Sequence, residues 1–147
     1  MLHDGSAWFL VADGRRARLL VEKKRGGELQ QPWAEEINDE DMYDPQDRPP
    51  RSFDRVGAGR HAMDKGRSLH EQEELNFLKR IATKITEAER RNDFDHLVIA
   101  APPRALGTLR ELLPDSVRSR VRAEAAKDLV DETQTQLRER LTDLLRN

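Results

Sequence analysis

The chain has 147 residues, a formal net charge of −2 and no cysteine, with 37% charged and 36% hydrophobic residues. The missing cysteines exclude disulfides, thiolate metal sites and cysteine nucleophiles. The near-neutral charge argues against a globally basic nucleic-acid-binding protein and leaves a local basic patch as the alternative. The length predicts a single domain over residues 1–147, and a charged fraction above the typical value of about 25% predicts a thin core.

The first residues are polar and lack the apolar stretch that defines a signal peptide. No apolar run approaches the roughly 20 residues that a membrane-spanning helix needs. We therefore expect a cytoplasmic protein that makes no contact with a membrane.

The chain begins with a predicted antiparallel hairpin. Residues 8–12 form a short apolar run, and Asp13-Gly14 directly after it is a strong tight-turn signal. Residues 17–23 are again apolar and rich in strand formers, so they form the second strand.

A third, weaker strand is predicted over residues 28–37, after a turn at Gly26-Gly27. Pro32 interrupts it and cannot donate a hydrogen bond to a strand ladder. This strand is therefore expected at the edge of the sheet or at a bulge.

Residues 39–67 show no helix or strand pattern and are rich in proline and glycine. Structureless segments of this length inside a domain are uncommon and tend to be functional or disordered. Their charges are sorted by sign, with an acidic half followed by a basic half. The acidic residues are Asp39, Glu40, Asp41, Asp44 and Asp47, and the basic residues are Arg48, Arg51, Arg55, Arg60, Lys65 and Arg67.

A long amphipathic helix follows this segment. Ser68 and Glu71 have capping-box spacing, with a serine at the predicted N-cap and a glutamate three residues later. Apolar residues then recur at the spacing of one helix face. They are Phe77, Leu78, Ile81, Ala82, Ile85 and Ala88.

The remainder alternates strands and helices. Residues 97–101 are continuously apolar and predict a central strand covered on both sides. A second helix follows Pro102-Pro103 and ends at Pro114, and residues 120–127 predict a fifth strand. Asp131 and Gln134 have capping-box spacing ahead of a last helix. Its predicted apolar stripe is Leu137, Leu141, Leu144 and Leu145.

The element order is therefore three strands, a long loop, and then helix, strand, helix, strand and helix. This order predicts an α/β fold with a five-stranded mixed sheet and three helices. Crossovers between parallel strands are right-handed in about 98% of cases, so helices can cover both faces of the sheet.

Several spaced motifs resemble those of the bacterial host attachment protein family, over nearly the whole chain. The family is similar to the middle domain of archaeal and eukaryotic peptide-chain release factors, which implies an RNase H-like sheet of order 3-2-1-4-5. The motifs are Trp8-Phe9-Leu10-Val11-Ala12-Asp13-Gly14-Arg15-Arg16-Ala17-Arg18, Gly59-Arg60-His61-Ala62-Met63, Val98-Ile99-Ala100-Ala101-Pro102-Pro103-Arg104-Ala105-Leu106-Gly107, and Ala123-Glu124 with Lys127-Asp128-Leu129.

The resemblance also implies where function lies. Release factors carry a catalytic Gly-Gly-Gln loop between the third strand and the next helix, and residues 56–61 match that region here. The second glycine is replaced by Ala58 and no glutamine follows. Without the glutamine that places a water at the ester, the loop argues against peptidyl-tRNA hydrolysis.

These observations favour a binding site over a catalytic one. Glycines allow close backbone approach and arginines neutralise phosphates, so the basic half of the loop, residues 48–67, is a candidate surface for RNA, the ribosome, tRNA or a protein partner. Arg104 follows the carboxyl end of a predicted strand and could meet an anion at a helix N-terminus. The candidate residues are Arg51, Arg55, Gly57, Gly59, Arg60, His61, Arg67 and Arg104.

Two alternatives remain open for the loop. His61 could replace the missing glutamine as the water-orienting group of a release-factor-like hydrolase, because an ordinary histidine titrates near ~6.5. Instead, the acidic half of the loop could contact a protein partner, or simply pair with the basic half.

The sequence indicates no metal or cofactor site. Residues 70–74 do not match the HExxH zinc motif, since position 74 is glutamate. Asp13 lies in a turn where aspartate has a local structural reason, Asp95 precedes its predicted strand, and Glu124 stands alone. A two-metal nuclease is therefore not predicted.

Overall fold

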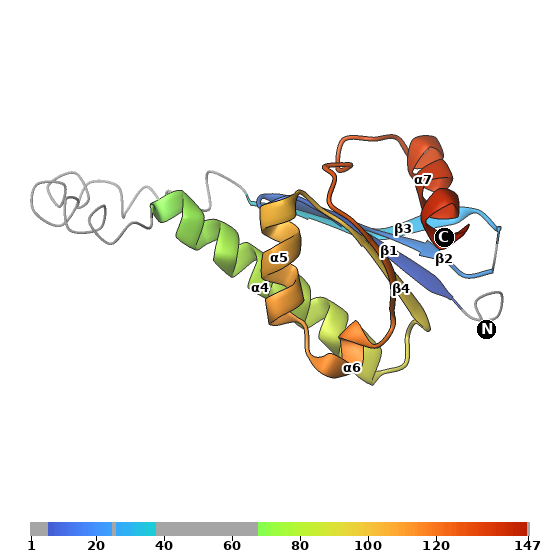
Figure 1. Cartoon of the computed structure of the whole chain (residues 1–147), viewed down its shortest axis with the longest axis horizontal. Helices are drawn as coiled ribbons and strands as arrows, with labels where there is room; N and C mark the ends of the chain where they lie inside the picture. Colours follow the sequence, from blue (N-terminus) through green and yellow to red (C-terminus); the bar gives the residue numbers. More distant parts are fainter. Residues whose placement is uncertain (1–5, 25, 38–67, 147) are drawn as a thin grey trace, which may run out of the picture.

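The computed structural model describes residues 6–24, 26–37 and 68–146, and its described part is an α/β structure built on a five-stranded sheet (Figure 1). The strand order is β3-β2-β1-β4-β5, which confirms the predicted fold. The strands are β1 (Ala7–Ala12), β2 (Arg16–Glu22), β3 (Leu29–Glu36), β4 (His96–Ala100) and β5 (Val121–Ala125). The helices are α4 (Leu69–Arg90), α5 (Pro103–Leu112), α6 (Asp115–Arg118) and α7 (Gln134–Arg146).

The sheet is antiparallel on one side and parallel on the other. Strands β1 and β2 form the predicted hairpin, in which Ala12 pairs with Ala17 and the N–H of Asp13 donates to the carbonyl of Arg16 at 2.9 Å. Strand β1 also pairs parallel with β4, and β4 pairs parallel with β5. The apolar strands β1 and β4 thus occupy the centre of the sheet, where both faces are covered.

Helices cover both faces, as predicted (Figure 1). One cluster of buried side chains joins α4, α5 and α6 to the sheet, including Phe77 and Leu109. A second cluster joins α7 to the other face through Leu137 and Leu141. Side chains alternate along each strand, so successive residues of β1 feed the two clusters in turn: Phe9 belongs to the α7 cluster and Leu10 to the α4 cluster.

Strand β3 is an edge strand and contains a bulge at Pro32. The pairing register with β2 shifts between Leu19, which faces Trp33, and Val21, which faces Gln30. The proline therefore occupies a place where no ladder hydrogen bond is needed from it, and the prediction from Pro32 is confirmed.

One of the two predicted capping boxes is present in the structure, and the other is formed by different residues. Ser68 accepts from the N–H of Glu71 at 3.0 Å, and the Glu71 carboxylate accepts from the N–H of Ser68 at 3.1 Å, so the first capping box is confirmed. The second capping box, predicted at Asp131 and Gln134, was wrong. The reciprocal pair at the start of α7 is formed by Thr133 and Gln136, with contacts of 2.9 and 3.1 Å.

The described part also holds a fourth, short helix, α6, which the sequence did not predict. Pro114 ends α5 and is at the same time the N-cap of α6, because its fixed φ suits the residue before a helical turn. Four residues are too few to show a periodic pattern. No helix of the described ranges is long and apolar enough to span a membrane.

Candidate functional site

The carboxyl ends of the parallel strands β1, β4 and β5 meet at one edge of the sheet, which we call the carboxyl edge. From β1 the chain continues to β2 on one side, and from β4 it continues through α5 to β5 on the other. In open α/β sheets, ligands bind where the chain diverges in this way. A crevice of about 250 Å³ lies there. It is lined by Gly14, Glu71, Glu74, Leu75, Leu78, Pro102, Arg104, Ala105 and Thr108.

Arg104 is at this edge, as expected, and it pairs with a carboxylate. Its side chain is 78% exposed, and its Nη2 lies 2.9 Å from Oε2 of Glu71. The hydrogen bond to Glu71 and the charge of that carboxylate raise the pKa of the Arg104 guanidinium. Because the other oxygen of Glu71 caps α4 through Ser68, Glu71 connects the first turn of α4 to the first turn of α5.

Glu74 lines the same crevice, one turn further along α4. Its carboxylate packs against Gly14, where an added Cβ would lie 2.7 Å from Oε1 of Glu74. A glycine at this turn thus permits the close approach of the two segments. The crevice therefore contains two carboxylates and one guanidinium. This lining is more acidic than we expected for an anion site at Arg104.

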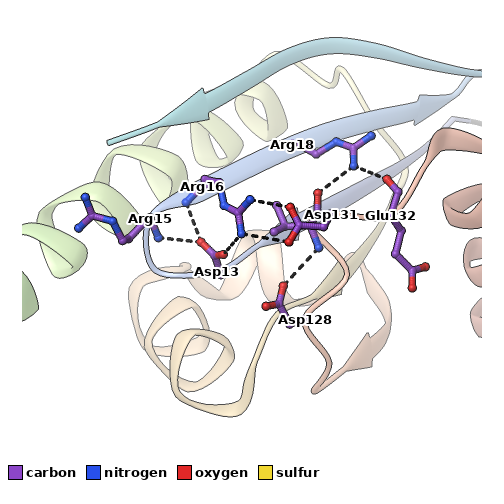
Figure 2. A network of polar contacts seen from close by, with 8 residues as sticks. Asp13, Arg15, Arg16, Arg18, Asp128, Asp131 and Glu132 are labelled. Atoms are coloured by element: carbon purple, nitrogen blue, oxygen red, sulfur yellow. Dashed lines mark hydrogen bonds and ion pairs between the residues drawn. The ribbon is translucent and has the colours of Figure 1, made fainter. Parts of the chain in front are cut away.

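A network of arginine contacts lies beside the crevice (Figure 2). The Asp13 carboxylate accepts from the backbone N–H groups of Arg15 and Arg16 at 2.8 and 2.7 Å, which stabilises the β1–β2 turn. The Arg16 guanidinium donates to Oδ2 of Asp13 at 3.0 Å and to Oδ1 of Asp131 at 2.6 Å. These hydrogen bonds, first to Asp131 and then to Asp13, raise the pKa of Arg16.

Arg18 extends the network from the same strand (Figure 2). Its Nη1 donates to the backbone carbonyls of Val130 and Glu132 at 2.9 and 2.6 Å. The N–H of Val130 in turn donates to the carboxylate of Asp128 at 3.3 Å. Arg16 and Arg18 therefore fix the connection between β5 and α7 to strand β2.

Replacing Arg18 with alanine should lower the free energy of unfolding by about 1–3 kcal/mol, because it removes charged donors from two partly buried carbonyls. Backbone amides of residues 128–133 should also exchange with solvent faster than in the parent. Hydrogen exchange and urea denaturation measure both effects. Unchanged exchange in this connection would contradict the assigned role.

The other site residues predicted from the sequence, Arg51, Arg55, Gly57, Gly59, Arg60, His61 and Arg67, lie outside the described residues. The structure does place the points where their segment joins the fold. The N–H of Ile37 donates to the carbonyl of Arg15 at 2.8 Å, and Ser68 is the N-cap of α4, whose first turn lines the crevice through Glu71. Both junctions lie at the carboxyl edge.

The carboxylates considered for a nuclease are engaged in protein contacts. Asp13 holds the turn described above, Asp95 accepts from the N–H of Ser6 at 2.9 Å, and Glu124 accepts from Arg110 at 2.8 Å. Within the described part of the chain, no group of three or more histidine or acidic side chains is arranged to hold a metal ion.

These features define an α/β domain with the fold of a release-factor domain. A crystal structure of the archaeal translation termination factor aRF1 matches it with a TM-score of 0.50 and 10% sequence identity, a likeness that shows the fold alone. The match covers 96% of this chain and 39% of that one.

The chain belongs to the family described as "Protein required for attachment to host cells", whose model matches residues 8–141. The family resemblance of the sequence motifs is thereby confirmed. No curated protein matches the chain.

Proposed function

We propose that this protein is a non-enzymatic, cytoplasmic binding domain that contacts RNA or the ribosome through the basic segment, residues 48–67. The observation that carries the proposal is where this segment joins the fold. It lies between β3 and α4, and both junctions are at the carboxyl edge, where α/β sheets bind their ligands. In a release-factor-like fold the same place carries the segment that enters the ribosome.

The described arginines at this edge already have partners within the fold. Arg104 and Arg16 are paired with Glu71 and Asp131, and Arg18 is committed to backbone carbonyls. The basic residues of the segment are therefore the main candidates for phosphate contacts, which need cations that are available to displace counterions.

Capture of the tagged full chain from cell lysate at low salt tests the proposal. The lysate is divided, and one half is treated with RNase before capture. We expect ribosomal proteins or tRNA in the untreated half and their loss after RNase. If one discrete protein is retained in both halves, the domain binds a protein and the RNA proposal is wrong.

A further inference from the structure

A second hollow lies on a different face of α4 from the ion pairs that join this helix to β3. It is an open groove of about 470 Å³ between the C-terminal half of α4 and the junction of α5 with α6. Figure 1 shows α5 and α6 beside α4. One wall is the stripe of α4 that includes Lys79, Thr86 and Arg90, and the other contains Leu112 and Pro114. No sequence motif or family match assigns a function to it.

The shape of the groove suits a helix. Between Lys79 and Arg90, α4 lines the groove with the small side chains of Ala82, Thr83 and Thr86 and with Glu87. The small side chains let a second helix axis come close. Lys79 and Arg90 are eleven residues apart, or about 16 Å along a helix that rises 1.5 Å per residue. A docked helix of three turns would span this distance.

The charges of the groove indicate which kind of partner it can bind. Within the described residues Lys79 and Arg90 make no ion pair, whereas Arg80 and Lys84 on another face of α4 both pair with Glu35, at 3.6 and 2.8 Å. Glu87 is the one carboxylate among the described lining residues, so the groove is basic at both ends. A partner needs carboxylates at a matching separation.

A second copy of this chain does not meet that requirement. Two α4 helices packed antiparallel about a twofold axis would place Lys79 of each copy near Arg90 of the other. Like charges facing each other across an interface cost several kcal/mol. The geometry therefore favours a different protein.

We propose that the groove formed by α4, Leu112 and Pro114 docks an amphipathic helix of another protein, with an apolar stripe between two acidic ends. Leu112 and Pro114 contact the apolar stripe. Lys79 and Arg90 contact one carboxylate each. This is recognition of a helix in a groove, at a surface separate from the carboxyl edge.

The probe is a synthetic helical peptide with a leucine and alanine stripe and two glutamates eleven residues apart. A matched peptide carries lysine in place of both glutamates. Titration of each into the isotope-labelled full chain, followed by NMR shifts, should show salt-sensitive binding of the glutamate peptide alone. The shifted amides should belong to the stripe of α4 and to Leu112 and Leu113.

Charge reversal provides the decisive comparison. In the double variant K79E/R90E the glutamate peptide should bind about tenfold or more weakly, and the lysine peptide should gain affinity. The control K127E/R146E changes the same number of charges on exposed residues outside the groove and should behave as the parent. No binding of either peptide at millimolar concentration, or equal affinity in parent and K79E/R90E, would overturn the proposal.

Discussion

Replacing Glu22 with alanine should lower the free energy of unfolding by about 3–5 kcal/mol, the cost of breaking a buried ion pair by removing one partner. Glu22 is 3% exposed and lies at the end of β2. Its carboxylate pairs with Arg138 of α7 and accepts from the N–H of Gly26 at 3.1 Å. Arg138 also donates to the carbonyl of Gly27 at 2.6 Å. One carboxylate thus connects β2, the β2–β3 turn and α7.

Alanine at Arg138 should be similarly destabilising, because it removes the partner of the buried carboxylate. Arg140, two residues further along α7, provides the matched control. Its pair with Glu132 is exposed, so R140A should unfold close to the parent. Equilibrium denaturation in urea measures all three variants, provided the transition is two-state. An E22A protein within 1 kcal/mol of the parent would show that the pair is not a stabilising element.

The second large loss of stability is expected from truncating a buried side chain of α4. Phe77 is fully buried against the sheet, and truncation to alanine should cost about 3–5 kcal/mol through lost transfer free energy and the cavity left behind. Leu137 of α7 is fully buried in the cluster on the other face, and its truncation to alanine should cost about 2–5 kcal/mol.

Leu69 supplies the control for both, since it is on α4 and 60% exposed. Its replacement by alanine should change the free energy of unfolding by about 0.5 kcal/mol or less. If F77A and L69A unfold at the same urea concentration, the α4 layer does not contribute to the core as described.

The parts of the fold that were predictable depend on short-range patterns. Pro32, the Asp13-Gly14 turn and the Ser68–Glu71 capping box act within a few residues, so their consequences are visible in the sequence. The fold class followed from the alternation of such elements. The sheet order came from the family resemblance, because strand order depends on contacts between distant segments.

The features that escaped prediction are long-range. Asp131 was taken for a helix cap, but its carboxylate is bound by Arg16, which is 115 residues away in the sequence. Glu22 was not singled out by the sequence, because its burial depends on the packing of Arg138 from α7. The crevice was expected from the general rule for α/β sheets. Its acidic lining depends on which face of α4 turns toward Gly14, which the helical pattern alone did not indicate.

The most direct test of the proposed function is co-sedimentation of the purified protein with ribosomes, for the parent and for the double reversal R55E/R60E. The charge-matched control is R122E/R146E, at exposed positions on β5 and α7. We predict that the parent and the control sediment with ribosomes at low salt and are released as salt rises, and that R55E/R60E stays in the supernatant. Equal sedimentation of R55E/R60E and the parent would contradict a role for the basic segment in binding.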